Sequence, residues 1–187
     1  PITPTLFTGN KMAPACQTLS YKPCSFKPLI KTASTSCSIL TFSGVIAGSI
    51  SLVKIGNGML TLSGSNTYTG ATVINHGTLN IEQSYSIRHS STLTVNSGTV
   101  ARIYQTTDQT LDCSITGICG TIIKAGNARL TLTASNTTFA GTMIVSNGTL
   151  AVSSSGVIGS TNIILAAETM LVIGNTTGNV IGDNVNI

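Results

Sequence analysis

The sequence predicts an all-β fold, a parallel β-helix with roughly 20–25 residues in each coil. The first observation behind this is a long internal repeat: GNGMLTLSGSNTYTGATVINHGTLNI (residues 56–81) recurs as GNARLTLTASNTTFAGTMIVSNGTLAV (residues 126–152). The second is that apolar and polar residues alternate in short segments. The third is that Gly and Asn corners recur at matched places in both copies. Short strands between such corners bury an apolar face only when coils stack on one another.

The composition also favours strands over helices. Charged residues make up 7% of the chain, against about 25% in ordinary soluble domains. Ser, Thr, Asn and Gly replace them, and the good helix formers Glu, Lys, Arg and Gln are scarce. The net charge of +4 comes from Lys11, Lys22, Lys27 and Lys31, and after residue 41 the charges balance. We therefore expect no nucleic-acid partner, which would need a basic face.

Two regions differ in composition. All five prolines and three of the five cysteines lie in residues 1–37, so we expect an irregular leader or cap there. Residues 38–187 are expected to form the β-helix, with two long repeats at about 41–103 and 111–173. No apolar run reaches the roughly 18–20 residues of a membrane helix, so we expect no direct membrane insertion.

Alternation within each repeat separates an inward from an outward set of residues. In residues 59–63 the two leucines share one face and Thr61 takes the other, which predicts that Thr61→Lys is tolerated and Leu62→Asp is not. The same pattern recurs in residues 77–81. The predicted core positions are Leu60, Leu62, Leu79 and Ile81 in the first copy, and Leu130, Leu132, Leu150 and Val152 in the second.

The corners between these strands carry Gly and Asn, which tolerate tight turns. Asn side chains at such corners are expected to bond local backbone groups. The predicted corner positions are Gly56, Asn66, Gly70 and Gly77 in the first copy, and Gly126, Asn136, Gly141 and Gly148 in the second.

The spacing of the copies constrains the number of coils. Matched residues are 70 positions apart, and 71 apart after one inserted residue near Thr138. A looser segment at 86–103 corresponds to 156–173. Because this spacing is too long for one coil, we expect three coils of roughly 23 residues in each repeat. Meander hairpins are the alternative, but they would not need a corner residue at a fixed interval.

Cysteine usage leaves two interpretations open. Cys113 and Cys119 lie six positions apart, so they could form a disulfide only if the segment between them folds back. Otherwise both are expected to be small buried residues. None of the cysteine spacings matches a zinc site.

Groups that could carry catalysis are sparse. Only five carboxylates exist, and nothing in the sequence brings Glu82, Asp108 or Asp112 together in a cleft. His76 and His89 lack the context of a catalytic histidine. We therefore expect no enzyme activity, no metal and no cofactor.

A sequence pattern links the repeats to a known family. The pattern G-x-G-x-L-T-L-S-G-x-N-T-Y-T-G, followed by T-x-[IV]-x-x-G-T-L-x-[IV], resembles the passenger-associated repeat of bacterial autotransporters. The match is close over residues 56–81, weaker over 126–152, and extends through flanks from about 41 to 173. The second copy departs from the pattern with Ala128 and Ala134, and five cysteines are more than such passengers usually carry.

The resemblance implies a right-handed β-helix exported by a C-terminal β-barrel translocator, which we expect outside this segment. It implies a non-enzymatic stalk or adhesin region, secreted or displayed at the bacterial surface and attached to the outer membrane. Such virulence factors have host glycans or surface proteins as candidate partners. Two alternatives stay open: a β-helical polysaccharide lyase or hydrolase whose catalytic coils lie outside this segment, and a phage or surface fibre.

Overall fold

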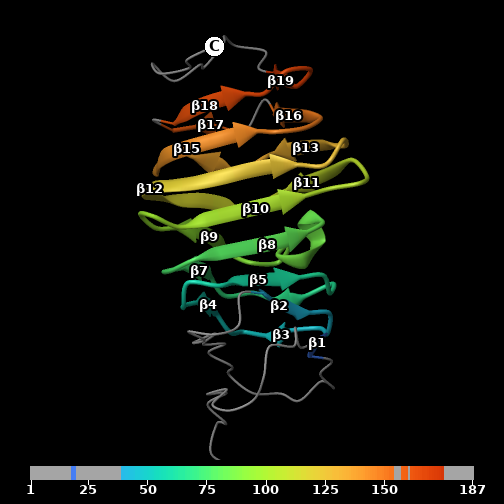
Figure 1. Ribbon diagram of the computed structural model, residues 1–187, viewed down its shortest axis with the longest axis vertical. Helices are drawn as coiled ribbons and strands as arrows, with labels where there is room; N and C mark the ends of the chain where they lie inside the picture. Colours follow the sequence, from blue (N-terminus) through green and yellow to red (C-terminus); the bar gives the residue numbers. More distant parts are fainter. Residues whose placement is uncertain (1–17, 20–38, 154–156, 160, 175–187) are drawn as a thin grey trace, which may run out of the picture.

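The computed structural model describes residues 18–19, 39–153, 157–159 and 161–174, which form a stack of about six coils (Figure 1). The strand pairs are parallel, whereas hairpins would pair antiparallel. The predicted all-β parallel β-helix is therefore confirmed. Within the described residues no helix is long and apolar enough to cross a membrane.

Each coil contains about 21 residues, at the short end of the range for solenoid repeats. Leu60, for example, pairs with Leu40 in one neighbouring coil and with Leu79 in the other. Side-chain hydrogen bonds between neighbouring coils span from 18 positions, between Thr72 and Ser90, to 26 positions, between Ser84 and Thr110. The strand registers define three faces, which we call the first, second and third face in the order in which the chain visits them.

The first face is a continuous column of paired strands, seen as the broad arrows in Figure 1. Its inward positions align from coil to coil, so that each strand buries its apolar residues on those of the next. The column consists of β2 (Ile39–Phe42), β5 (Met59–Leu62), β8 (Thr78–Glu82), β10 (Val100–Tyr104), the second part of β12 (Ser114–Ala125), the second part of β15 (Phe139–Val145) and β18 (Asn162–Leu165), with β1 (Thr18–Leu19) beside β2.

The second face is interrupted by a short 3-10 helix. This helix, η1 (Ser84–Ser86), is bonded on one side by Asn66 Nδ2, which donates to Ser86 O at 2.7 Å. On its other side Ser84 Oγ donates to Gln109 Oε1 at 2.7 Å. The strands of this face are β3 (Ala47–Gly48) and β6 (Thr67–Tyr68) before η1, and β11 (Gln109–Leu111), β13 (Arg129–Leu132), β16 (Thr149–Val152) and β19 (Met170–Ile173) after it.

The third face joins the first through a long bent strand. β12 belongs to the third face at its start and to the first face at its end, and its register shifts between Ile118 and Thr121. Gly117 and Cys119 have positive φ at this bend. The third face contains β4 (Leu52–Lys54), β7 (Thr72–Ile74), β9 (Thr92–Val95), the first part of β12, β14 (Ser135–Asn136) and β17 (Val157–Ile158).

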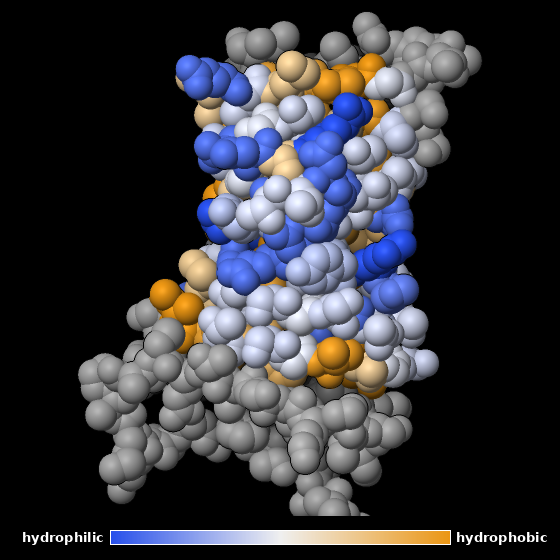
Figure 2. Space-filling view, turned by 90° about the vertical axis from the view of Figure 1, so that its right-hand side faces the viewer, coloured by the Kyte–Doolittle hydropathy of each residue, from blue (hydrophilic) through white to orange (hydrophobic). Residues whose placement is uncertain are grey.

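The interior is apolar and the lateral surface is largely polar. Leu, Ile and Val from all three faces form one core cluster running through the stack. Figure 2 shows mostly polar residues along the side of the solenoid, with hydrophobic residues toward its two ends. Ile39 and Val45 at one end, and Ile164 and Met170 at the other, are among the exposed large hydrophobics.

The two sequence copies occupy different faces of the solenoid. β5 lies on the first face, whereas its counterpart β13 lies on the second. Likewise β7 lies on the third face and its counterpart in β15 on the first. The expected division of each repeat into three whole coils is therefore wrong. Because each coil has about 21 residues, within the predicted 20–25 but fewer than the roughly 23 that three whole coils would need, the spacing between the copies covers three coils and one further face.

Thr61 differs from its predicted environment, and most of residues 1–37 lie outside the described structure. Thr61 points away from the core, but it is only 5% exposed because Asn80 and Arg102 continue the same outward ladder above it. Asn80 Nδ2 donates to Thr61 Oγ1 at 3.4 Å, so Thr61→Lys is not the harmless change that alternation suggests. Of residues 1–37, only Thr18 and Leu19 are among the described residues, and the rest of that region lies outside them.

Candidate functional site

The predicted core residues all lie in the interior. None of the eight is more than 4% exposed, and they face the same axis from the first and second faces. This set comprises Leu60, Leu62, Leu79, Ile81, Leu130, Leu132, Leu150 and Val152.

The predicted corner glycines meet two different needs. Gly126 has a φ of +80°, and a Cβ there would lie 2.0 Å from the carbonyl oxygen of Gln105 in the coil below. Gly70 has an ordinary φ, but a Cβ would lie 2.2 Å from Ile50 O, so close approach of coils is what requires glycine. Of the other predicted corners, Gly56, Gly77 and Gly148 also have positive φ, and Gly141 lies against Gly120 O and the Phe139 ring.

The corner asparagines bond across coils more than locally. Asn66 Oδ1 accepts from Ile46 N at 2.8 Å, and its Nδ2 donates to Ser86 O, so one side chain links three coils. Asn136 Oδ1 accepts from Ile115 N at 2.7 Å, and its Nδ2 donates to Ala134 O at 3.0 Å. Both side chains are buried. They satisfy backbone groups that a turn would otherwise leave unpaired.

Two buried lysines form anchors that the sequence reasoning missed. Lys54 Nζ donates to the carbonyl oxygens of Ile55, Gly56 and His76 at 3.1, 2.6 and 3.1 Å. Lys124 Nζ does the same with Ala125, Gly126 and Asn147 at 3.3, 2.7 and 2.9 Å. Each ammonium thus joins the corner of its own coil to that of the next. Burial lowers the pKa of both lysines. The sequence did contain a signal for these anchors, because Lys54 and Lys124 recur at the 70-residue spacing of the two copies.

Cys113 and Cys119 are free thiols, so the disulfide that the spacing left open is not formed. Cys113 is 4% exposed, just before β12, whereas Cys119 is exposed at the bend of β12. The segment between them continues along the strand instead of folding back. The alternative of two buried thiols holds for Cys113 alone. Cys16, Cys24 and Cys37 lie outside the described residues.

The acidic residues are used in separate structural contacts. Asp108 Oδ1 accepts from Arg129 N, and Asp112 Oδ1 accepts from Thr133 Oγ1, each at 2.8 Å and each across neighbouring coils. Among the described residues no group of three or more His, Cys, Asp and Glu side chains converges as a metal site would require.

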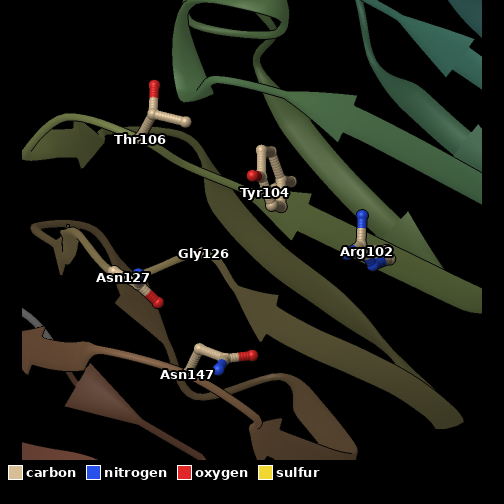
Figure 3. A pocket seen from close by; sticks show the side chains of 6 residues that line it. All are labelled: Arg102, Tyr104, Thr106, Gly126, Asn127 and Asn147. Atoms are coloured by element: carbon tan, nitrogen blue, oxygen red, sulfur yellow. The ribbon is translucent and has the colours of Figure 1, made fainter.

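A shallow polar groove lies between the first and second faces. It has a volume of about 360 Å³ and lies where β10 ends and where the next two coils turn. In Figure 3 Tyr104 and Thr106 lie on one coil, and Asn127 and Asn147 lie on the two coils that follow it. We call this feature the corner groove; Arg102, Tyr104, Thr106, Gly126, Asn127 and Asn147 line it.

Comparison with known proteins agrees with the repeat architecture. A family model described as the passenger-associated-transport-repeat matches residues 52–81 and 122–152. The adhesin BmaC autotransporter of Brucella suis biovar 1 (strain 1330) is 33% identical over 145 residues, which is 66% of this chain. The chain spans only 4% of that relative's length. No solved structure matches this chain.

Both matched segments coincide with the two copies of the internal repeat, residues 56–81 and 126–152. Residues 52–81 run from β4 to β8, and residues 122–152 run from the second part of β12 to β16. Each segment contains one lysine anchor, one corner asparagine and several strands that contribute to the apolar core. The chain therefore carries two passenger-associated-transport repeats and is similar to an autotransporter adhesin, as the sequence pattern predicted.

Proposed function

We propose that this chain is a non-catalytic stalk or adhesin region of an autotransporter passenger. The observation that carries the proposal is the tandem passenger repeat folded as a continuous parallel β-helix. A relative over much of the chain is named as an adhesin autotransporter. Such a region is exposed at the bacterial surface or secreted and is tethered at the outer membrane.

The proposal includes a translocator that carries this region across the outer membrane and lies outside residues 1–187. The stacked core supports a load-bearing role, because each coil is held to its neighbours by strand pairing, lysine anchors and asparagine bridges. The polar side surface offers hydroxyl and amide groups to host glycans or surface proteins. The dispersed carboxylates support a non-enzymatic role.

Surface display tests this function. The chain, fused to a translocator on a non-adherent bacterium, is compared with the translocator alone for binding to host cells and matrix proteins. We expect several-fold more bound bacteria for an adhesin, or surface exposure with no added binding for a stalk. Release of fragments from an acidic polysaccharide by the purified chain would contradict the non-catalytic assignment.

A further inference from the structure

The corner groove combines an aromatic ring, a guanidinium group and two carboxamides. The Arg102 guanidinium carbon lies 5.1 Å from the centroid of the Tyr104 ring. Arg102 Nη1 donates to Asn80 Oδ1 at 3.0 Å, and Arg102 forms no ion pair within the described part of the chain. Its charge is therefore held in place without being neutralised. Tyr104 is 36% exposed, so part of its ring is accessible from the groove.

A second positive charge lies directly beneath the groove. Lys124 Nζ donates to the carbonyl oxygens of Gly126 and Asn147, and both residues line the groove. Because the ammonium is buried, water screens its field less than it would at an exposed site. The groove therefore has a cation at its wall and another under its floor.

Nearby acids reduce this positive charge without cancelling it. Asp108 is close enough to Lys124 to raise the pKa of that amine, and its carboxylate is bonded to Arg129 N. Glu82 pairs in register with Tyr104 on the neighbouring coil. Arg129 adds a positive charge at the same corner as Asp108. With three cations against two carboxylates, the corner keeps a net positive charge, and neither carboxylate lines the groove.

This combination matches the chemistry of an acidic sugar. The C–H face of a sugar ring packs on an aromatic ring, carboxamides exchange hydrogen bonds with its hydroxyls, and a guanidinium pairs with a carboxylate in two-point geometry. The volume of about 360 Å³ lies in the usual range of small-molecule sites, about 300–1,000 Å³. We infer that the corner groove binds a saccharide unit carrying a carboxylate, such as a sialic or uronic acid.

The groove belongs to the junction of the two copies and does not recur after the second. Arg102 and Tyr104 end the first copy, whereas Asn127 and Asn147 belong to the second. At the matched positions of the second copy the chain has Val172 and Gly174 in place of the arginine and the tyrosine. This inference rests on the proposed adhesin function and supplies its ligand class.

The test is a titration of the full chain with three soluble probes, followed through backbone amide resonances in NMR. The probes are sialyllactose, neutral lactose and lactose sulfate. We expect sialyllactose to shift the amides of Asn127 and Asn147 with a millimolar Kd, and the other two to bind at least tenfold more weakly. Absence of these shifts, or equal affinity for lactose, would overturn the inference. Equal affinity for lactose sulfate would overturn the carboxylate specificity.

Matched variants assign the binding to the groove. Arg102→Gln and Tyr104→Ala should each weaken sialyllactose binding at least tenfold, while Arg102→Lys keeps part of the affinity. The controls are Arg88→Gln and Tyr85→Ala, which change exposed residues of the same types outside the groove. Circular dichroism confirms that each variant is folded. Unchanged affinity in folded Arg102→Gln and Tyr104→Ala would contradict the assignment.

Adherence assays separate this inference from the proposed function. If displayed wild-type chain adheres to host cells but binds no saccharide, the groove inference fails and the adhesin function stands. If the chain binds sialyllactose but adds no adherence, the groove stands and the adhesin role fails. Loss of both sugar binding and adherence in Arg102→Gln supports both together.

Discussion

Tyr68 in the first copy and Phe139 in the second occupy matched buried positions, but only the tyrosine carries a hydroxyl. Tyr68 Oη lies 2.6 Å from Thr72 Oγ1, which lies 2.9 Å from Ser90 Oγ. Ser90 Oγ in turn bonds the carbonyl oxygen of Gly70 at 2.9 Å. The first copy therefore contains a chain of hydroxyls that runs from the core to the backbone of a corner.

The second copy lacks this series of hydroxyl hydrogen bonds. Met143 matches Thr72, so the phenyl ring of Phe139 and the methionine side chain replace the bonded pair together. In the next coil Thr161 Oγ1 donates to the backbone, to Phe139 O at 3.2 Å. A buried hydroxyl without its partner costs more than an apolar pair of similar size. At this position the two copies avoid an unpaired buried hydroxyl by exchanging both residues together.

Replacing a lysine anchor should cause the largest loss of stability, and the loss should be equal in the two copies. Lys54→Met and Lys124→Met each leave three carbonyl groups at a corner without their buried donor, which we expect to cost roughly 3 kcal/mol of unfolding free energy. Chemical denaturation measures the loss, and Arg88→Met at an exposed position is the control. A large loss in only one variant would show that the two anchors are not equivalent.

Exchanging the aromatic residues should have unequal effects in the two copies. Phe139→Tyr introduces a hydroxyl opposite Met143, which cannot pair with it strongly, and we expect a loss of about 2 kcal/mol. Tyr68→Phe removes one hydrogen bond from a chain whose remaining hydroxyls still pair, and should cost about 1 kcal/mol. Thermal and chemical denaturation of both variants measures this order. The opposite order would mean that the hydroxyl chain is not what distinguishes the copies.

Alkaline pH should destabilise the protein through a cysteine that only the second copy has. Burial raises the pKa of the Cys113 thiol to about 12, whereas the residue matched to it in the first copy is Ser43. The folded thiol keeps its proton, whereas the unfolded thiol loses it near about pH 8.5. The contribution of Cys113 to the free energy of unfolding is therefore fully present below that pH. It then falls by up to about 1.4 kcal/mol per pH unit as the pH rises toward about 12.

Denaturation at pH 7 and pH 9.5 compares wild type with two variants. Cys113→Ala should lose less stability than wild type over this interval, because no buried thiol remains to hold a proton. Cys119→Ala changes the exposed cysteine and should keep the wild-type dependence. If both variants behave alike, Cys113 is not the source of the difference.

The smallest effect concerns a turn that both copies share. Gly98 and Glu168 occupy matched positions and have φ of +72° and +61°. The next residue, Thr99 or Thr169, donates from Oγ1 to a carbonyl three positions back at 2.7 Å in both turns. Only glycine adopts this φ without strain, so Glu168→Gly should gain about 0.5–1 kcal/mol and Gly98→Glu should lose a similar amount. Paired melting curves check the opposite signs.

The alternation in sequence was sufficient to predict the fold class, because a period of two identifies strands and recurrent corners identify coils. The face on which each strand lies could not be predicted from the alternation. Neighbouring coils differ in length by small insertions, which only the strand registers reveal. Thr61 illustrates a second limit: alternation gives its direction, but Asn80 and the adjacent coils decide its exposure.

The corner groove shows a third limit. Tyr104, Asn127 and Asn147 come from three successive coils, at spacings that follow the coil and not the repeat. No motif joins them, so the sequence pattern did not single them out. For Lys124 the recurrence of Lys54 at the repeat spacing was a signal, but the sequence alone did not show that the ammonium is buried against corner carbonyls.

The mismatch between repeat and coil has a mechanical consequence. With coils about 4.8 Å apart, one repeat unit advances about 16 Å along the axis while its features rotate by about one third of a turn. A filament built from successive units of this kind would point equivalent side chains in three directions and return to the starting direction after about 48 Å. Its resistance to bending would be similar in every direction. Whatever such a rod presents would be reachable from any side without the rod having to twist.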